Sequence, residues 1–393
     1  MELSNICEYS SKRIDSSLLN VENYVSTENM MQNKGGITLA AKVPVENSVE
    51  FLPGDILISN IRPYFRKIWL SDKKGGCSSD VLCIRALPGT DSTYLYYLLS
   101  QDSFFDYVMS GAKGCKMPRG DKSQIMQWDV DLPNFEEQHR IAGILKSIDD
   151  KIQLNNQINH NLEEQAQALY KSWFVDFEPF RGGKFVDSEL GLIPEGWKIG
   201  KINDVINLLS GFPFKSSDFQ ENGDYQLITI KGVQDGYLDV TSADMLSSLP
   251  SKMPQYCILN IGDILISLTG NVGRICIVDR NNLLLNQRVA ILSPKNIRDS
   301  FYVYTMFRSE SMKDELIHLA RGTAQLNLSP IETGEKLTVI PPDSILEAFA
   351  KVGKGTFNQY ISLKMENIRL MEMRDSLLPK LMSGELKIND LNC

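Results

Sequence analysis

The chain contains an internal repeat whose two copies are offset by 208 residues. The segment Gly54–Ser59 reads Gly-Asp-Ile-Leu-Ile-Ser, and the same six letters recur at Gly262–Ser267. The same offset, without a gap, relates Arg66 to Arg274, Val81 to Val289, Tyr96 to Tyr304, Gly114 to Gly322, and Pro133 to Pro341. Chance identities do not keep one register over so long a span. We therefore expect two copies of one structural unit.

Each copy has the local pattern of a mixed α/β globule. Short β-rich runs lie at residues 55–60, 67–70, 263–268 and 274–278. A capping-box pattern follows the strands in both copies, as Asp121 with Gln124 and as Ser329 with Glu332. In such a box a short side chain caps the third amide of a helix while Gln or Glu bonds back, so each pattern predicts a helix N-terminus.

A long helix with a coiled-coil seam is expected after each globule. The first seam has alternating four- and three-residue spacing and comprises Ile141, Leu145, Ile148, Ile152, Asn155, Asn159, Leu162, Ala166, Leu169 and Trp173. A helix from near Glu136 to near Asp176 would span roughly 60 Å. The equivalent positions in the second copy are Phe349, Gly353, Thr356, Tyr360, Leu363, Asn367, Leu370, Arg374, Leu377 and Leu381. Gly353 and Gly355 predict fraying or a kink there.

The two seams predict that the helices pair with one another in antiparallel orientation. The residues expected to make this pairing are Ile148, Ile152, Asn159, Leu162, Leu169, Tyr360, Leu363, Asn367, Leu370 and Leu377. Asn159 and Asn367 hold equivalent positions and have two interpretations, as solvated residues of a ragged seam or as polar core residues that fix the register. If they fix the register, replacing both with leucine raises the melting temperature. The acidic pairs Asp149-Asp150 and Glu163-Glu164 are expected to be exposed face charges.

These features predict an α/β fold class with two mixed α/β globules in a pseudo-twofold repeat and two long antiparallel coiled-coil helices. A Gly- and Pro-containing connector with several apolar residues joins the halves. The expected divisions are a first globule at 1–134, a central helix at 135–177, the connector at 178–196, a second globule at 197–341, a distal helix at 342–386 and a tail at 387–393.

Composition indicates the compartment in which the chain resides and how it could bind nucleic acid. The net charge is −8 and neither copy is frankly basic, so nucleic-acid binding would have to rest on local patches. The cysteines are odd in number and unpaired in spacing, which favours buried or idle thiols in a reducing compartment; they are Cys7, Cys77, Cys83, Cys115, Cys257, Cys276 and Cys393. No signal peptide or membrane-length apolar run is evident, and we expect a cytoplasmic protein.

The motifs of common enzymes are not found. The pairs Gly183-Lys184 and Gly200-Lys201 lack the flanking residues of a phosphate-binding loop, and no Gly-x-Gly-x-x-Gly occurs. The three histidines have neither metal-ligand spacing nor an evident nucleophile partner. We therefore expect a chain without catalytic residues, metal or cofactor of its own.

Several motifs, in this order, resemble the specificity subunits of type I restriction–modification systems over essentially the whole chain. The most specific is Glu136-Glu137-Gln138-x-Arg140-Ile141-Ala142 at the start of the first helix, followed by the segment 168–177, Ala-Leu-Tyr-Lys-Ser-Trp-Phe-Val-Asp-Phe. The connector segment 189–197, Glu-Leu-Gly-Leu-Ile-Pro-Glu-Gly-Trp, is equally typical. Gly54–Ser59 with Ile61-Arg62-Pro63-Tyr64, and Gly262–Ser267 with Gly270-Asn271-Val272-Gly273, match the target-recognition domains of that family.

The resemblance implies that each globule is a target-recognition domain that reads one half of a bipartite target in double-stranded DNA. It implies that the helices set the spacer between the half-sites and dock two adenine-specific DNA methyltransferase subunits, which restriction (translocase–nuclease) subunits join. S-adenosylmethionine, ATP and magnesium would then belong to those partners. The second copy departs from the pattern, because Ser344-Ile-Leu-Glu347 replaces the Glu-Glu-Gln-x-Arg entry, so the resemblance does not imply that the two docking sites are equivalent.

Candidate DNA contacts come from loop position and side-chain type. Glycine-containing basic loops that lead into helix N-termini can offer amides and cations to phosphates, Arg pairs with guanine, and Gln or Asn with adenine. The candidates are Arg62, Tyr64, Arg66, Lys113, Lys116, Arg119, Lys122, Arg274, Arg288, Arg321, Gln325 and Asn327. For each one, an ordinary solvated surface position is the alternative.

Two further questions stay open at this point. Trp173 and Phe174, at the end of the first helix, either pack in a core or dock a methyltransferase subunit. The whole chain is interpreted as a non-catalytic recognition subunit, and the alternatives are a free-standing, two-armed DNA-binding regulator and an enzyme with an unrecognised site. Only the first interpretation requires a methyltransferase gene nearby.

Overall fold

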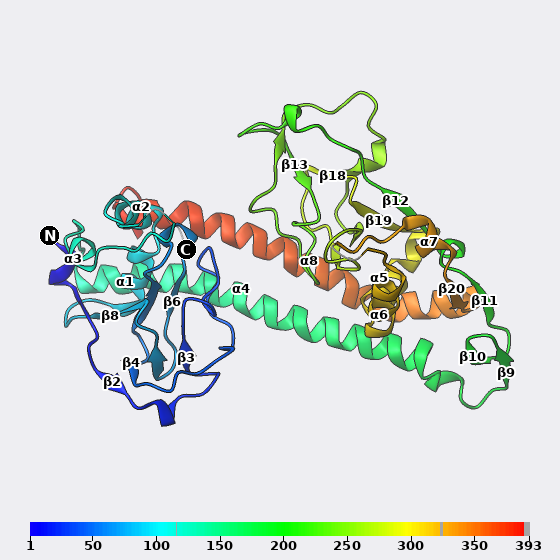
Figure 1. Cartoon of the computed structure of the whole chain (residues 1–393), viewed down its shortest axis with the longest axis horizontal. Helices are drawn as coiled ribbons and strands as arrows, with labels where there is room; N and C mark the ends of the chain where they lie inside the picture. The colour runs from blue at the N-terminus through cyan, green and yellow to red at the C-terminus, as the bar shows by residue number, and fades with distance from the viewer. Residues whose placement is uncertain (115, 323–324, 389–393) are drawn as a thin grey trace. The chain divides into compact units, whose positions relative to one another are not determined.

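The computed structural model describes residues 1–114, 116–322 and 325–388. The chain divides into two compact units. Unit 1 comprises Met1–Ile152 with Arg369–Cys393, and unit 2 comprises Gln153–Ile368. Each unit holds one globule together with part of each of two long helices, α4 (Phe135–Tyr170) and α8 (Asp343–Met382) (Figure 1).

The globule of unit 1 is built from two four-stranded sheets. The first has the order β1-β8-β5-β6, with β1 Cys7–Tyr9, β8 Val81–Ala86, β5 Ile56–Ser59 and β6 Ile68–Leu70. The second has the order β2-β4-β7-β3, with β2 Arg13–Ile14, β4 Ser48–Phe51, β7 Gly75–Cys77 and β3 Tyr24–Val25. All four residues of β5 are buried, as expected for an apolar run in the middle of a sheet.

Unit 2 also has two four-stranded sheets, and the first of them repeats the strand order of unit 1. Its first sheet has the order β12-β19-β16-β17, with β12 Ile206–Ser210, β19 Val289–Pro294, β16 Ile264–Ser267 and β17 Ile275–Ile277. Its second has the order β14-β13-β18-β15, with β14 Met245–Leu246, β13 Tyr225–Ile228, β18 Leu283–Leu285 and β15 Ile258–Leu259. One pair in each second sheet is parallel, β3 with β7 and β13 with β18. The strands expected from sequence are confirmed in both copies.

Short helices follow the strands at equivalent positions in the two units. Unit 1 has α1 Ser92–Leu99, α2 Asp102–Ser110 and α3 Lys122–Met126, and unit 2 has α5 Ser300–Arg308, α6 Glu310–Leu319 and α7 Pro330–Glu335. Two further pairs of strands lie in unit 2: the hairpin of β9 (Phe185–Ser188) and β10 (Gly191–Pro194) in the connector, and β11 (Lys198–Lys201) with β20 (Leu337–Ile340).

The short helices α3 and α7 begin at caps, but the capping boxes are only half formed. Asp121 accepts bonds from the amides of Ser123 and Gln124, and Ser329 accepts one from Glu332. The prediction of the reciprocal bond is wrong for Gln124, because its amide nitrogen bonds the carbonyl of Tyr107 at 2.8 Å and its buried Oε1 has no partner among the residues that the structure describes. The side chain of Glu332 pairs instead with Arg321 at 2.6 Å.

Within each unit, α4 and α8 run antiparallel. In unit 1, Asp149 of α4 bonds Arg374 of α8, and Ile141 and Leu145 share a core with Leu378 and Leu381. In unit 2, Asn155 of α4 bonds Asn367 of α8. The ring of Trp173, just after the end of α4, packs against the ring of Phe349 of α8. All ten residues expected to pair the helices are buried or half-buried.

The polar positions of the seam form a buried layer in unit 2. Asn155, Asn159 and Asn367 are 0%, 8% and 6% exposed, so the solvated interpretation of Asn159 and Asn367 is wrong. The partner of Asn367 is Asn155, whose Nδ2 donates to Oδ1 of Asn367 at 2.9 Å, while Nδ2 of Asn367 donates to Asn156 at 2.8 Å. The Oδ1 atom of Asn159 is buried and has no hydrogen-bond partner in the described part of the chain.

Replacing Asn159 with leucine is expected to raise the melting temperature, with a gain of about 1 kcal/mol in unfolding free energy. The substitution removes a buried acceptor that forms no bond and adds apolar packing at the seam. Thermal and urea unfolding measure the effect. The control is Asn161→Leu, two residues away on the exposed face, which we expect to change stability by less than about 0.5 kcal/mol. A fall in stability for Asn159→Leu alone would show that its amide is satisfied in solution.

The expected fraying at Gly353 and Gly355 is wrong, because α8 is helical through both residues. At Gly353 an added Cβ would lie 1.9 Å from the ring of Phe301, so this glycine lets the ring pack directly on the helix backbone. At Gly355 nothing lies within 4 Å of that position. The intrinsic cost of glycine in a helix is therefore offset by packing at the first position.

The helix-entry motif of the first copy has a structural role. Gln138 is 1% exposed; its Oε1 accepts from the amide of Asp91 at 2.9 Å, and its Nε2 donates to the carbonyls of Gly89 and Pro133. The side chain thus joins the start of α4 to the globule. Leu346, the equivalent residue in α8, is buried and packs in the core of unit 2 by apolar contact instead.

The aromatic end of the first helix is part of the core of unit 2. A π-helical turn, Lys171–Val175, follows α4, and within it Phe174 is buried with its ring 4.7 Å from that of Phe349. Trp173 is half-buried between Phe180 and Phe349. The core interpretation of these residues is therefore observed, and only Trp173 keeps substantial surface.

Candidate nucleic-acid interface

Each globule brings its two candidate loops together by the same backbone pairing. In unit 1, Arg119 in the loop before α3 pairs with both Ile61 and Lys113. In unit 2 the equivalent Asn327 pairs with Thr269 and Arg321, so every partner is shifted by the repeat offset. The loop after the central strand, β5 or β16, is thus joined to the loop before α3 or α7. Cys115 and residues 323–324 of these loops lie outside the described residues.

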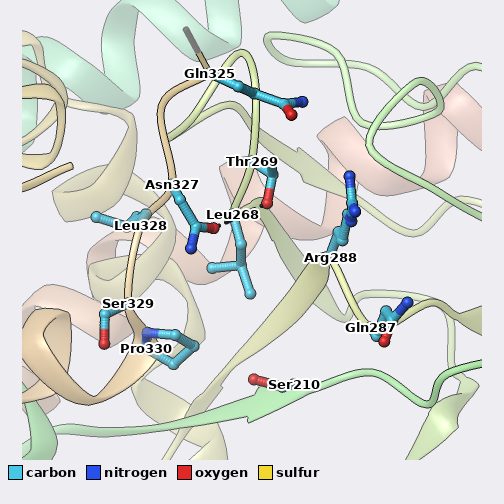
Figure 2. A pocket seen from close by; sticks show the side chains of 10 residues that line it. All are labelled: Ser210, Leu268, Thr269, Gln287, Arg288, Gln325, Asn327, Leu328, Ser329 and Pro330. Atoms are coloured by element: carbon cyan, nitrogen blue, oxygen red, sulfur yellow. Dashed lines mark hydrogen bonds between the residues drawn. The ribbon is translucent and has the colours of Figure 1, made fainter. Parts of the chain in front are cut away.

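In unit 2 this junction forms a polar hollow of about 560 Å³. Figure 2 shows its lining side chains, which come from the loops before β19 and α7, from the segment after β16 and from the end of β12. They are Ser210, Leu268, Thr269, Gln287, Arg288, Gln325, Asn327, Leu328, Ser329 and Pro330. The structure therefore brings Arg288, Gln325 and Asn327, which the sequence analysis had named separately, into one site.

The hollow carries unpaired donors and acceptors. Arg288 is exposed and forms no ion pair with any residue in the described ranges, while the carbonyl of Arg288 accepts the amide of Leu268 at 2.9 Å. Gln287 and Gln325 are exposed, and Asn327 accepts a bond from the Thr269 hydroxyl at 3.0 Å. One cation beside side-chain amides is the donor and acceptor set that discriminates bases in a major groove.

Sequence reasoning did not find three of the polar lining residues, Ser210, Thr269 and Gln287. Gln287 directly precedes Arg288, and Thr269 aligns with Ile61 of the first copy, so the repeat itself could have pointed to both. Ser210 ends β12, outside the ungapped part of the repeat, and no local pattern indicates it.

The equivalent position in unit 1 has different chemistry. Asp80 stands where unit 2 has Arg288, and Arg119 stands where unit 2 has Asn327. These two side chains form an ion pair at 3.2 Å, so the cation lies on the other loop and is partly neutralised. The backbone framework is thus the same in the two units, and the polar groups that it presents are not.

Unit 1 also presents a strained basic turn, which we define as residues 62–66. A short 3-10 turn, Pro63–Phe65, is flanked by Arg62 and Arg66, whose φ angles are 51° and 50°. Positive φ is unfavourable for residues other than glycine, and such strain concentrates at functional sites. The turn is held from outside, because the amides of Asn33 and Lys34 donate to its carbonyls, both at 2.9 Å.

Four cations surround this turn and one carboxylate faces them. Lys34 and Arg66 both pair with Asp102, at 3.3 and 2.9 Å. Burial and the nearby charge of Arg62 lower the pKa of Lys67. Arg62 has a buried Nε that bonds none of the described residues. Tyr64, at the tip, is 48% exposed, so its ring is free to contact a ligand.

Comparison with known proteins identifies the family. The family model described as "Type I restriction modification DNA specificity domain" matches residues 1–164 and 194–343. The type I restriction enzyme MjaIX specificity subunit of Methanocaldococcus jannaschii is 30% identical, over 77% of this chain and 71% of that protein. The HindI specificity subunit of Haemophilus influenzae is 25% identical, over 98% of both chains.

The chain belongs to the type I restriction–modification specificity subunits. A crystal structure of such an S subunit from M. genitalium agrees in fold, with a TM-score of 0.57 and 16% sequence identity over 97% of this chain and 95% of that one. The resemblance read from the motifs is confirmed, and a free-standing regulator is not favoured. The two stretches matched by the family model each contain one globule.

The other candidate residues of this specificity subunit are dispersed or paired. Lys113 pairs with Asp121 at 2.7 Å, and Arg321 with Glu332 at 2.6 Å, at the edges of the two loops. Lys116 is exposed, and the Lys122 ammonium lies 5.9 Å from the ring centre of Tyr9. Arg274 is half-buried and donates to Gln234 at 2.5 Å, so the structure places it outside the polar hollow.

The remaining titratable groups of this specificity subunit indicate structural roles. Cys7, Cys77, Cys83, Cys257 and Cys276 are free and buried, and burial raises the pKa of Cys7 and of Cys276 to about 12. Thiols with so high a pKa are poor nucleophiles. Cys115 and Cys393 lie outside the described residues. Across the described part of the chain there is no cluster of residues that could hold a metal ion, and no helix there is long and apolar enough to span a membrane.

Proposed function

We propose that each globule reads one half of a bipartite target in double-stranded DNA, and that the chain itself performs no catalysis. The observation that carries the proposal is the pair of equivalent loop junctions. They share one backbone framework and differ in their polar side chains, Asp80 and Arg119 in one and Arg288 and Asn327 in the other. A duplicated framework with different donors and acceptors suits recognition of two different short sequences.

Within this proposal the strained basic turn and the polar hollow make different kinds of contact with DNA. The cations around residues 62–66 suit phosphate contacts, which position a protein on the duplex, and Tyr64 is free to stack on or wedge beside a base. Arg288, Gln325 and Asn327 suit base edges. The cations on the two loops and at the start of α3 are assigned to phosphates; they are Lys113, Lys116, Arg119, Lys122 and Arg321. Arg274 is assigned a structural role.

The partners follow from the family. We propose that two adenine methyltransferase subunits dock on the helices, that restriction subunits join them, and that all cofactors belong to these partners. Within the proposal the segments 1–134 and 197–341 are the recognition domains, 135–177 and 342–386 are the helices, 178–196 is the connector and 387–393 is the tail. Trp173 is the better docking candidate of the aromatic pair, because Phe174 is buried. The free thiols suit a reducing cytoplasm.

Mapping adenine methylation across the genome of the source cells, with this gene present and deleted, tests the proposal. We expect a split motif with a fixed gap to lose its methylation when the gene is deleted. Restoring the gene should restore the same motif. If no methylated motif depends on the gene in cells that express the methyltransferase partner, the proposal is wrong and a two-armed regulator becomes the better explanation.

A further inference from the structure

One carboxylate of α4 in each unit is held at the same time by a tyrosine and an arginine. In unit 1, Asp149 accepts a bond from the Tyr97 hydroxyl at 2.6 Å and one from Nη1 of Arg374 at 2.8 Å. In unit 2, Glu163 accepts from the Tyr304 hydroxyl at 2.6 Å and from Nε of Arg308 at 3.0 Å. We call these two groups the unit 1 clamp and the unit 2 clamp.

The clamps correct the expectation that these acidic pairs are exposed face charges. The Glu163 side chain is only 15% exposed, whereas that of the adjacent Glu164 is 66% exposed. Asp149 and Asp150 differ in the same direction, at 29% and 56%. One acidic residue of each pair therefore faces the globule of its unit, and its neighbour faces solvent.

Each clamp joins three elements of its unit. In unit 1 they are α1 of the globule, α4 and α8, through Tyr97, Asp149 and Arg374. In unit 2 they are α5, α4 and α8, because the hydroxyl of Tyr304 also lies 3.2 Å from that of Tyr360 on α8. Figure 1 shows α5 and α6 lying against the long helices. The globule of each unit is thus fixed to both long helices by directional bonds.

The two clamps are not copies of one another. The repeat offset relates Asp149 to Phe357 and Glu163 to Met371, neither of which is acidic. The arginine comes from α8 in one clamp and from α5 in the other. Duplication therefore does not account for the shared arrangement.

The unit 2 clamp has further hydrogen bonds to the segment that contains Gln234, Asp235 and Gly236. Arg308 also bonds Asp235, which Lys313 bonds at 2.8 Å, and the adjacent Gly236 carbonyl accepts from Lys364 of α8 at 2.8 Å. In the same segment Gln234 accepts from Arg274.

The last step runs through the loop that precedes Arg274. The amide of Gly270 there donates to the carbonyl of Leu326, between Gln325 and Asn327, at 2.9 Å. Hydrogen bonds alternating with short stretches of backbone thus lie between α4 and the residues proposed to read bases.

We infer that Asp149 and Glu163 are positioning residues that fix where each recognition globule sits on the long helices and so determine which spacer length between half-sites is accepted. The inference rests on the proposed function. Apolar packing alone would permit small sliding and rotation, whereas a carboxylate held by two directional donors permits neither. Buried ion pairs add little net stability compared with apolar packing, and fixing one geometry is the better-supported use of such groups.

The test uses the full-length chain assembled with its methyltransferase subunits and DNA duplexes that carry the target motif with its natural spacer or with one base pair added or removed. The ratio of methylation rates on natural and altered spacers is the measured quantity. We expect Glu163→Gln and Asp149→Asn each to lower this ratio by about tenfold, equivalent to about 1.4 kcal/mol. Glu164→Gln and Asp150→Asn, the exposed neighbours, should leave it unchanged.

The outcomes separate the inference from the function on which it rests. If the unchanged protein shows no preference for a bipartite site, the proposed function and the inference both fail. If it shows the preference and Glu163→Gln retains the full ratio, the inference alone is overturned. If Glu163→Gln does not fold, Tyr304→Phe, which removes one hydroxyl from the same clamp, replaces it and must lower the ratio while its melting temperature stays near that of the parent.

Discussion

Replacing Arg288 with alanine is expected to weaken binding of the complex to its target by about 10- to 100-fold and to relax recognition at one base pair of one half-site. The side chain is exposed in the polar hollow of unit 2 and pairs with no acid in the described ranges, so its guanidinium is available to a guanine edge. Its backbone is fixed by the bond to Leu268 at the end of β16. A bidentate arginine–guanine contact discriminates by about 1–3 kcal/mol.

The measurement is competition binding against a set of duplexes in which each target position is varied in turn. Lys295 supplies the control, because it follows β19 while Arg288 precedes it, so the two cations lie at opposite ends of one strand. Lys295→Ala should keep both affinity and specificity. Arg288→Ala could instead weaken binding equally for all sequences and reduce the slope of log affinity against log salt concentration by about one. That result would mean that Arg288 contacts a phosphate and not a base.

Replacing Gly353 with alanine is expected to destabilise the protein by about 2 kcal/mol or more, although alanine is the better helix former. The new methyl group would lie 1.9 Å from the ring of Phe301, which is 3% exposed and stacks on Phe349 at 5.0 Å. The ring cannot move without disturbing the core of unit 2, and overpacking of this kind typically costs 1–3 kcal/mol.

The control for this substitution lies two residues further along the same helix. Gly355→Ala meets nothing within 4 Å and should stabilise the protein by about 0.5–1 kcal/mol, the gain in helix propensity. Urea unfolding of both variants, followed by circular dichroism, gives the comparison. Equal stability of the two variants would show that Phe301 leaves the helix surface in solution.

Much of the fold was predictable because it follows from local patterns. The repeat offset, the central strands with the sequence Ile-Leu-Ile-Ser, the helix starts at Asp121 and Ser329, and the long helices each depend on residues near one another in the chain. The family followed from the order of short motifs. The candidate loops were also found in this way, since a glycine-containing basic loop before a helix cap is a local feature.

The site itself was not predictable from these patterns. Arg288 and Asn327 come from loops almost forty residues apart, and only the pairing of Asn327 with Thr269 and Arg321 brings them into one hollow. Asp80 and Arg119 neutralise one another in the first copy for the same reason. Sequence spacing identifies side chains that are able to bind DNA, but their partners depend on contacts between distant segments.

The sequence by itself determined that this chain has two α/β globules, two long helices and the motifs of a specificity subunit, because periodicity, capping and repetition act over short distances. Tertiary structure alone decided that Asn155 is the partner of Asn367, that Phe301 packs on Gly353, and that Glu163 is clamped while Glu164 is exposed. Neighbouring residues of the same type acquire different roles because burial and bonding depend on which distant surface each one faces.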